Sequence, residues 1–496
     1  MVNDPAQQTA DAPARQDDTS TMPDLIPRAV VVLASVVTLG VVMSTLDTTV
    51  VTVGVDAMSR ALKAPVSTIQ WVATSYLLAF SAVIPLTGWV VDRFGIRRSW
   101  LTALLLFTVA SALCGLSWSA GSLIVFRTMQ GLGGGMLLPL AQTALARAAG
   151  PKLLGRVMAM AAIPGMLSPV FGPLIGGVIV DSLSWRWLFY VNLPIGAIAL
   201  AMAARVMKTE PIRPEMKLDV LSVMLLSPGI GAVIYGFSEA SGSQGFGSTS
   251  SLSALVIGAV MLAAFAVHSL RRGERALVNL RLFKVRGFSA AAATSFLLGA
   301  SLFGALILFP LYYQLVRGQD SMTAGLMLAP QGIGAVLIMP YAGKLTDRLG
   351  PGPVVLGGLV LAMLGTLPYA YVGRHTSEPL LAGVLLVRGL GLGATFMPTL
   401  VAAYRSIAGE YVSQATSVVN IAQRVGGSLG TALVTLILQM EYQHHAGHEA
   451  QLGAVRVGSS ENLVPAFDDA LLWTLGFGLI ALVPALLLPR KEQPAS

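Results

Sequence analysis

A single carboxylate lies within the first long apolar stretch of the sequence. Residues 29–55 run through Val, Leu, Ala, Met and Gly almost without interruption, and Asp47 is the only charged residue among them. About 20 apolar residues are enough to cross a bilayer. Because an ionised side chain is costly in hydrocarbon, one that persists there normally has a partner or faces a polar cavity. We expect Asp47 to have a partner and to face a polar cavity; the alternative is a carboxylic acid kept protonated or hydrogen-bonded for helix packing.

A cation that could partner Asp47 lies in the fourth apolar stretch. Arg127 is six residues from the predicted outer end of that stretch, and Asp47 is eight residues from the outer end of its own. At 1.5 Å per residue these positions correspond to depths of roughly 9 and 12 Å, so the two side chains can meet. A helix movement that separates them would change the proton affinity of Asp47, which is what proton coupling requires. A static salt bridge is the alternative.

The elements that must position these residues are membrane-spanning helices. Hydrophobic residues make up 54% of the 496 residues and charged residues 11%, whereas a soluble domain carries roughly 25% charge. Only a helix satisfies its own backbone in lipid, so each apolar run is expected to be helical. Fourteen runs are present: 29–55, 67–91, 99–118, 121–143, 157–181, 186–206, 218–238, 251–270, 287–316, 321–343, 352–373, 379–402, 411–439 and 466–489. The single cysteine, Cys114, lies in one of them and is expected to be a small core residue.

The distribution of basic residues predicts the orientation of these helices. With the N-terminus in the cytoplasm, 23 of the 32 Lys and Arg residues fall in the tails and even-numbered loops, six fall outside and three lie inside helices. This positive-inside bias places both chain ends in the cytoplasm. The membrane is expected to be the plasma membrane. The net charge of +8 is then a signal of topology rather than of nucleic-acid binding. Residues 1–28 are expected to form a disordered tail rather than a signal peptide.

Two pairs of similar segments indicate that the chain contains two related halves. GWVVDRFG at 88–95 is echoed by GKLTDRLG at 343–350, and FRTMQGLGGGMLLP at 126–139 by VRGLGLGATFMP at 387–398. Repeated halves around a central site are a recurring transporter architecture. The predicted parts are an N-terminal six-helix half at 29–206, two additional helices with a cytoplasmic linker at 207–286, a C-terminal six-helix half at 287–489 and a short cytoplasmic tail at 490–496.

Five motifs resemble those of one family. GWVVDRFGIRR at 88–98 resembles the signature between helices 2 and 3 of the major facilitator superfamily. LDTTVVTVGV at 46–55, LIVFRTMQGLGGG at 123–135 and GPLIGG at 172–177 are similar to motifs of its drug:proton antiporters, and SWRWLFYVNLPIG at 184–196 is similar to a signature of the fourteen-helix branch (EmrB/QacA type). The resemblance implies an all-α integral membrane protein with the major facilitator fold, in which two six-helix halves and two extra central helices give 14 transmembrane helices.

The resemblance also implies roles for particular residues. It assigns proton coupling to Asp47 and Arg127. It assigns the closing of the cytoplasmic side to a gating loop made of Gly88, Asp92, Arg93, Gly95, Arg97 and Arg98, with Asp347 and Arg348 in the second half. It links a third motif, Gly172, Pro173, Gly176 and Gly177, with exporters rather than importers. By their chemistry these four residues are expected to kink the fifth helix and to let a neighbour pack closely, and small-residue packing alone is the alternative.

Several residues are candidates for lining a substrate cavity. They are Trp71, Tyr76, Met136, Tyr312, Tyr313, Asn420 and Arg424. Arg388 and Arg424 have no acidic counterpart in their own half, so hydrogen bonds to helix carbonyls are the favoured interpretation. The alternative is that they line the cavity and meet an anionic or polar part of the substrate. His444, His445 and His448, in a predicted outer loop at 441–464, could bind a metal, but a solvated loop without metal is favoured.

We therefore expect a secondary active exporter that carries out proton-coupled antiport of amphipathic, hydrophobic or cationic compounds by alternating access. The alternative within this class is a dedicated exporter of a single metabolite, antibiotic or lipid. A channel would require a ring of like residues, and an enzyme would require clustered catalytic side chains; neither pattern is found in the sequence. The expected partners are a small-molecule substrate, protons and the lipid bilayer, with no cofactor and no nucleic acid, and the protein is expected to be a monomer.

Overall fold

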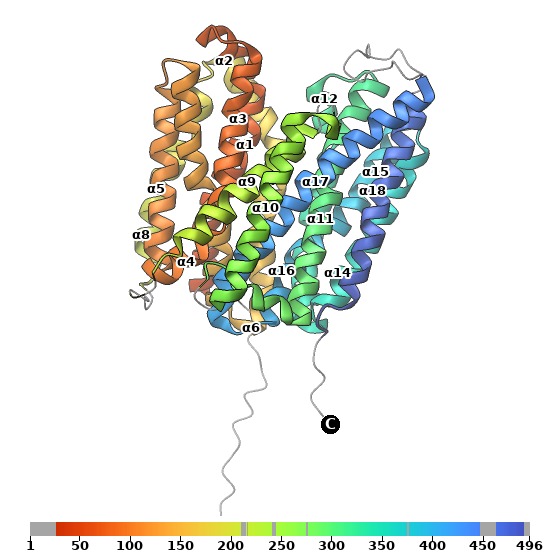
Figure 1. Ribbon diagram of the computed structural model, residues 1–496. Coiled ribbons are helices and arrows are strands. Elements are labelled where there is room, and N and C mark those ends of the chain that lie inside the picture. The colour runs from red at the N-terminus through yellow and green to blue at the C-terminus, as the bar shows by residue number, and fades with distance from the viewer. Residues whose placement is uncertain are drawn as a thin grey trace, which may run out of the picture.

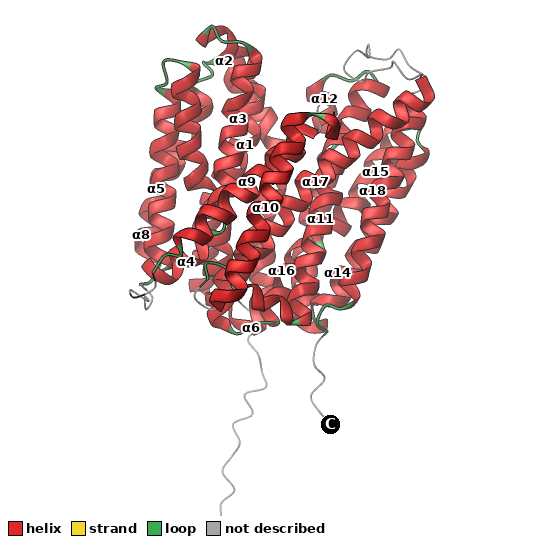
Figure 2. Cartoon of the chain, in the orientation of Figure 1, coloured by secondary structure: helices red, strands yellow, loops and turns green. Residues whose placement is uncertain are grey.

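The computed structural model describes residues 26–209, 215, 217–240, 245–273, 276–373, 376–446 and 463–490. All regular secondary structure in these residues is helical, as Figure 2 shows. The first half comprises α1 (Arg28–Val53), α2 (Val55–Leu62), α3 (Val66–Val83), α4 (Leu86–Phe94), α5 (Ile96–Gly115), α6 (Ala120–Ser182), α7 (Trp187–Tyr190) and α8 (Asn192–Val206).

The remaining helices form the central insertion and the second half. The insertion contains α9 (Val220–Ala240) and α10 (Thr249–Arg272), with 3₁₀ turns at Gly245–Gly247 and Leu280–Lys284. The second half comprises α11 (Arg286–Leu311) with a π-helical turn at Tyr312–Val316, α12 (Ser321–Met327), α13 (Ala329–Leu349), α14 (Pro351–Thr366) with a 3₁₀ turn at Leu367–Tyr371, α15 (Glu378–Gly393), α16 (Phe396–Arg405), a 3₁₀ turn at Gly409–Tyr411, α17 (Val412–Ala446) and α18 (Leu463–Leu486).

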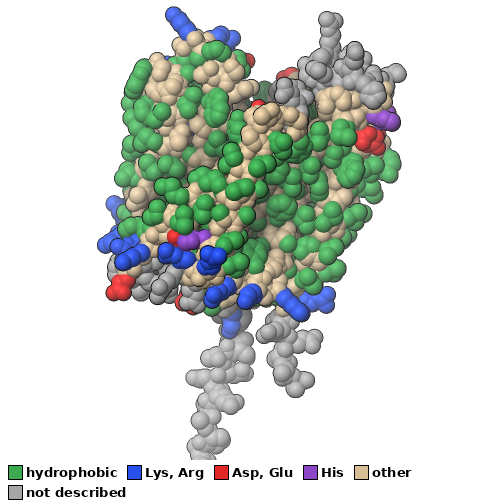
Figure 3. All heavy atoms as spheres, viewed as in Figure 1, with side chains coloured by type: hydrophobic (Ala, Val, Ile, Leu, Met, Phe, Trp, Pro, Cys, Tyr) green, Lys and Arg blue, Asp and Glu red, His purple; other side chains and the backbone are tan. Residues whose placement is uncertain are grey.

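Thirteen helical segments of the described residues are long and apolar enough to cross a membrane. They correspond to thirteen of the fourteen predicted runs, and the remaining run, 157–181, lies in the second part of α6. Large apolar side chains such as Val178, Val260 and Leu479 are exposed, and Figure 3 shows the sides of the molecule covered with hydrophobic side chains. Such a surface is suited to lipid and not to water. The chain is a multi-pass membrane protein.

Proline and glycine account for the places where the helices depart from the predicted runs. The run 67–91 is split into α3 and α4 at Pro85, which has no backbone N–H to donate. The runs expected at 121–143 and 157–181 are joined in the single helical stretch α6, whose direction changes at Gly150, with φ 64° and ψ 175°. A positive φ is readily adopted only by glycine, so the turn between the two spans is made by this residue.

The two halves are arranged as equivalent units, and the additional helices lie outside them. Helix α6 packs against α1 and α13, and α17 packs in the corresponding way against α11 and α4. Gly95 and Gly350, the last residues of the repeated octapeptides, both have positive φ (79° and 87°) and join equivalent helix pairs. Helix α9 packs against α10, α3 and α17, so the inserted pair contacts both halves and crosses the front of the molecule in Figure 1.

Candidate functional site

Asp47 is enclosed by hydrogen-bond donors in the first half. It is 2% exposed, and its Oδ2 atom lies 2.5 Å from the Nη1 atom of Arg127. Its Oδ1 atom accepts hydrogen bonds from the side-chain amides of Gln130 and Asn192, each at 3.0 Å. The structure therefore brings Asp47 and Arg127 into contact and adds two neutral donors to the carboxylate. This is a buried, fully hydrogen-bonded ion pair.

Residues of α3 and α7 contact the guanidinium of Arg127 on the sides that do not face Asp47. Its Nε atom donates to the backbone carbonyl of Val72 at 3.2 Å. The ring of Tyr76 lies 4.1 Å from the guanidinium carbon and that of Phe189 lies 5.7 Å away, so both aromatic faces stabilise the cation. The Nη1 atom also donates to the amide oxygen of Gln130 at 2.8 Å, so the guanidinium keeps several partners in the absence of Asp47. The cation can stay in place when the carboxylate is protonated.

Gln130 and Asn192 were not among the predicted site residues. Gln130 lies one helical turn after Arg127, which puts both side chains on one face of α6, and this i, i+3 spacing was the signal available in the sequence. Asn192 is the first residue of α8 and also donates to the hydroxyl of Ser111 at 3.1 Å. Cys114 is buried as predicted and lies 3.6 Å from the amide oxygen of Gln130. Its thiol therefore belongs to the same polar cluster.

Glycines allow the helices around this cluster to approach closely. A Cβ atom on Gly131 would lie 2.5 Å from the carbonyl oxygen of Tyr76. On the other side of α1, a Cβ atom on Gly172 would lie 1.9 Å from the Oγ1 atom of Thr49, and one on Gly176 would lie 2.9 Å from the carbonyl oxygen of Val50. These contacts hold α1, α3 and both parts of α6 at a distance that lets Asp47 and Arg127 meet.

The motif at 172–177 therefore packs against α1 within one or two turns of Asp47. Gly172 and Gly176 make the close contacts, whereas a Cβ atom on Gly177 would meet nothing within 4 Å. The side chain of Pro173 lies outside the described residues. Residues 151–182 are helical throughout, and the non-helical backbone in α6 is at Gly150. The close packing expected of this motif is present, whereas no break in the helix marks it.

A cavity of about 240 Å³ lies between the two halves. It is lined by Val41, Thr45, Leu138, Gln142, Ala162, Ser295, Leu298, Leu302, Phe303, Phe396, Met397, Leu400, Val419, Asn420, Gln423 and Arg424. Asn420 donates a hydrogen bond to the amide oxygen of Gln142 at 2.7 Å, so polar side chains of both halves meet at its wall. Of the seven candidate cavity residues, Asn420 and Arg424 line it.

The other five candidates lie elsewhere. Trp71 is 43% exposed and lines a groove on the outside of the bundle, where it stacks on α9. Tyr76 is buried against Arg127, and Met136 packs against an apolar core that includes residues of both halves. Tyr312 and Tyr313 are buried in an aromatic cluster in the second half. An aromatic or methionine side chain in an apolar helix is suited to core and lipid contacts as well as to a cavity, so its type did not distinguish these positions.

The two arginines of the second half have different surroundings. Arg388 is buried and donates hydrogen bonds to the side chains of Thr366 and Gln331, so its partners are polar side chains rather than helix carbonyls. Arg424 faces the cavity and lies over the ring of Phe80, 4.1 Å from its centroid. Among the described residues its side chain has no hydrogen-bond or ion-pair partner.

At the end of the bundle that carries the repeated octapeptides, Asp92 connects the two halves. It lies 3.3 Å from a guanidinium nitrogen of Arg147 in its own half, and it accepts a hydrogen bond from the hydroxyl of Ser413 in α17 at 3.2 Å. Gly88 lies against the backbone of the same helix, and a Cβ atom built on Gly88 would lie 3.5 Å from the backbone of Gln414. The hydroxyls of Thr87 and Ser417 meet nearby at 2.8 Å.

Asp347 makes the equivalent connection from the second half. It accepts hydrogen bonds from the backbone N–H of Gly155 at 2.9 Å and from the Nε atom of Arg156 at 3.2 Å, both in the first half. A guanidinium nitrogen of Arg405 lies 3.5 Å from it within its own half. We call these two sets of contacts, around Asp92 and Asp347, the latch.

The cations of the latch differ from those that the sequence suggested. Arg147, Arg156 and Arg405 supply them, and none of these was a candidate. Arg97 instead donates to the carbonyl oxygen of Ala204 at the end of α8 in its own half. In the part of the chain that the structure describes, Arg93, Arg98 and Arg348 form no ion pair with the other half. A basic residue in a short loop can set the topology without making a contact. Proximity to Asp92 in the sequence therefore did not identify the cation that contacts Asp92.

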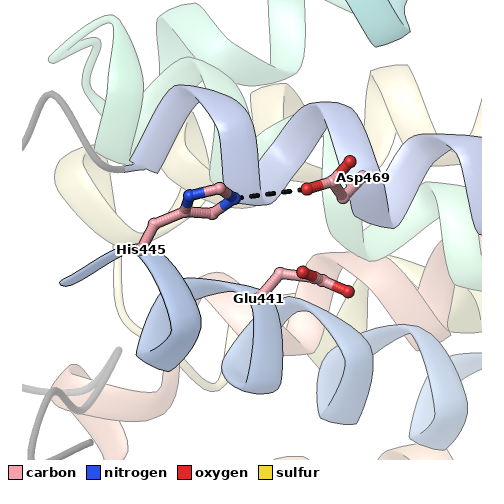
Figure 4. A group of neighbouring side chains, drawn as sticks. All are labelled: Glu441, His445 and Asp469. Carbon is pink, nitrogen blue, oxygen red and sulfur yellow. Dashed lines mark hydrogen bonds and ion pairs between the residues drawn. The ribbon is translucent and has the colours of Figure 1, made fainter. Parts of the chain in front are cut away.

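Figure 4 shows a polar group near the end of α17 that includes one predicted candidate. His445 is 3.3 Å from Asp469 of α18, and the ligand atoms of Glu441, His445 and Asp469 lie within 4.8 Å of one another. His444 and His445 belong to the last turn of α17 rather than to a loop, which corrects the prediction for 441–446, and His448 lies outside the described residues. Exposed acidic groups commonly gather in this way, and the hydrogen bond between His445 and Asp469 accounts for the contact.

Comparison with known proteins identifies the family. Residues 37–431 match the Major Facilitator Superfamily. The chain belongs to this family. It is 38% identical over 424 residues to the "Multidrug resistance protein B homolog" of Mycobacterium tuberculosis (strain ATCC 25618 / H37Rv). The matched region covers 85% of this chain and 78% of that protein. It is 29% identical over 433 residues to the "Multidrug export protein EmrB" of Haemophilus influenzae, covering 86% and 83%.

A solved structure shares the fold. The proton:xylose symporter XylE, bound to 6-bromo-6-deoxy-D-glucose, superposes with a TM-score of 0.61 at 14% identity and covers 93% of this chain and 96% of that one. This likeness shows the fold alone. The predicted major facilitator fold is confirmed, and the family and fold indicate a membrane transporter.

Proposed function

We propose that the protein is a proton-coupled exporter of amphipathic compounds, in which Asp47 carries the proton. It works as a monomer in the plasma membrane with both chain ends in the cytoplasm. Two relatives are named for multidrug resistance or multidrug export, which supports export as the direction of transport. The observation that carries the proposal is the enclosed contact between Asp47 and Arg127.

This contact can exist in two charge states. With Asp47 ionised, Arg127, Gln130 and Asn192 all donate to the carboxylate. When Asp47 takes up a proton it loses the charge that attracts Arg127, while the aromatic faces and the Val72 carbonyl still hold the cation. Protonation therefore weakens the attachment of α1 to α6 specifically, since Asp47 is on α1 and Arg127 and Gln130 are on α6.

The latch accounts for the conformational change that transport requires. Its contacts join the halves at one end of the bundle, and Lys and Arg side chains gather around that end in Figure 3. Basic residues favour the cytoplasmic side, so we assign this end to the cytoplasm. The cavity lies between the halves, and breaking the latch would open it toward the cytoplasm. Alternating access then consists of making and breaking the latch while the charge state of Asp47 changes.

The test is uptake of a dye into inverted membrane vesicles under an imposed pH gradient. The Asp47→Asn variant keeps the shape of the side chain and cannot release a proton, so we expect it to lose gradient-driven uptake while still inserting in the membrane. Asp320→Asn is the matched control, since Asp320 is a carboxylate at the start of α12 that contacts Thr323 in its own helix. Wild-type uptake by Asp47→Asn would exclude Asp47 as the proton carrier.

A further inference from the structure

The charge of the central cavity comes from one side chain. Of the 16 described residues that line the cavity, Arg424 is the only one with a charge. Its neighbours on the wall are apolar, such as Leu298, Phe303 and Met397, or neutral and polar, such as Gln423. The lining therefore combines a large apolar surface with one cation.

In the described part of the chain, Arg424 lacks the polar partners that the other two intramembrane arginines have. Arg127 is paired with Asp47, and Arg388 donates to two polar side chains. Within the described residues, Arg424 has only the face of the Phe80 ring, at 4.1 Å. A cation removed from water is costly unless it is paired and hydrogen-bonded. The guanidinium has five N–H donors in a planar fork that suits carboxylate, sulfonate or phosphate groups.

Three acidic side chains that could attract a cationic ligand already have partners. Asp47 accepts hydrogen bonds from three side chains and is 2% exposed. Asp92 and Asp347 are held in the latch. A cationic ligand in the cavity would therefore meet Arg424 with no described carboxylate to offset the repulsion. This arrangement disfavours the cationic compounds that the sequence alone suggested.

We propose that Arg424 binds an anionic group of the transported molecule, so that the cavity selects amphipathic anions over cations of similar size. The inference rests on the proposed export function and narrows the class of its substrates. The apolar wall accepts the hydrophobic part of such a molecule, and the anion replaces the ring of Phe80 as the partner of Arg424. The neutral side chains of Ser295 and Gln423 are placed to donate further hydrogen bonds.

The experiment measures binding of two dyes that differ by one charged group. The probes are 8-anilino-1-naphthalenesulfonate and N-phenyl-1-naphthylamine, which share a ring system and differ in the sulfonate. Binding to the full-length protein purified in detergent is followed by fluorescence without any proton gradient. In Arg424→Gln we expect the sulfonate to bind at least about tenfold more weakly, since a charged hydrogen bond is lost, whereas the affinity for the neutral dye changes by less than about twofold.

Three further variants complete the design. Arg424→Lys keeps the charge and is expected to retain part of the preference for the sulfonate. Ser295→Asp places a carboxylate on the cavity wall and is expected to weaken sulfonate binding while leaving Arg424 intact. Arg271→Gln removes an exposed cation at the end of α10, outside the cavity, and is expected to change neither affinity.

The results separate this inference from the proposed function. The deciding quantity is the affinity for the sulfonate dye divided by the affinity for the neutral dye. If this ratio is unchanged in both Arg424→Gln and Ser295→Asp, Arg424 does not select the charge of the ligand. The inference is then wrong even if gradient-driven export is observed. If the ratio falls in both variants, the inference holds even if wild-type protein shows no response to a proton gradient. In that case only the proton-coupled part of the proposed function would fail.

Discussion

At the scale of single residues, the central feature is that Asp47 has three donors and not one. A pair of opposite charges would be separated by a shift of α1 against α6, whereas Asn192 holds the carboxylate from a third helix. Gln130 lies on the same helix as Arg127, while Asn192 is on α8. The three donors therefore approach Asp47 from two helices, and each has a separable effect on proton exchange.

Removing the charge of Arg127 is expected to abolish gradient-driven export at neutral pH. Without the cation, the buried carboxylate is more stable in its neutral form, so the protein keeps its proton where the wild type releases it. Substrate binding to Arg127→Ala should accordingly depend less on pH. The measurement is a pH titration of binding to Arg127→Ala and wild type side by side. Superimposable curves would show that Arg127 is purely structural.

Asn192→Leu should move the pH profile of transport without abolishing transport. It removes one neutral hydrogen bond to the ionised carboxylate and leaves the ion pair with Arg127 in place. A bond of this kind, to a charged group, contributes about 1.5–3 kcal/mol, so a shift of about one pH unit or more is expected. Transport is measured across a pH series, with Asn192→Asp as the second variant. A lower rate at every pH with an unmoved profile would show that Asn192 acts on packing alone.

At the scale of helices, small residues decide whether the polar cluster can form. Gly172 and Gly177 belong to the same motif and differ in what they touch, which provides a matched pair. A Cβ atom on Gly172 would lie 1.9 Å from Thr49, whereas one on Gly177 would meet nothing within 4 Å. Gly172→Ala should therefore displace α1 and lower both transport and thermal stability, and Gly177→Ala should change neither. Equal behaviour of the two variants in a thermal unfolding assay would contradict this assignment of the motif to helix packing.

The inserted helices are joined to each other by a hydrogen bond between Asp219 and His268. Asp219, just before α9, accepts hydrogen bonds from Ser222 and lies 2.9 Å from the Nε2 atom of His268 in α10. Burial alone would raise the pKa of Asp219, but the hydrogen bonds from Ser222 and His268 outweigh it and lower the pKa below its usual value. A lowered native pKa means that the contribution to stability is present above the pKa of the unfolded chain and is lost as pH falls through the native pKa.

Asp219→Asn is accordingly expected to destabilise the protein by about 1–2 kcal/mol at neutral pH, through weaker hydrogen bonds to His268. The difference from wild type should shrink as the pH falls below about 3.9, the pKa of an ordinary aspartate, and toward the lower pKa of native Asp219. The measurement is the midpoint of thermal unfolding of both proteins across this pH range. A difference that persists unchanged at low pH would mean that the charge of Asp219 is not the cause.

At the scale of the whole molecule, the sequence predicts the helices and the two related halves but not the contacts between them. Apolar length placed the spans, because a bilayer imposes it, and the repeated octapeptides revealed the equivalence of Asp92 and Asp347. Which cation each aspartate meets depends on how the halves dock, and Arg156 and Arg405 carry no local signal of it. The same holds for Arg424, whose exposure to the cavity depends on residues of four helices besides its own, α1, α6, α11 and α16.

The latch allows the population of the closed state to be tested directly. Asp347 connects its own half to Gly155 and Arg156 of the other half, so Asp347→Asn should favour opening at this end. Losing hydrogen bonds to a charged group costs about 1.5–3 kcal/mol, which shifts the opening equilibrium by about tenfold or more. A cysteine at Ser417, whose hydroxyl meets Thr87 across the halves, reports opening by its rate of reaction with a maleimide. The native Cys114 is buried and is replaced by Ala in the background.

We expect the Ser417→Cys reporter to react about tenfold faster when combined with Asp347→Asn. Glu378→Gln is the matched control, because it breaks an ion pair with Arg317 within the second half and should leave the rate unchanged. If Asp347→Asn left the rate unchanged as well, the contacts around Asp347 would not hold this end closed, and alternating access would require a different closing contact.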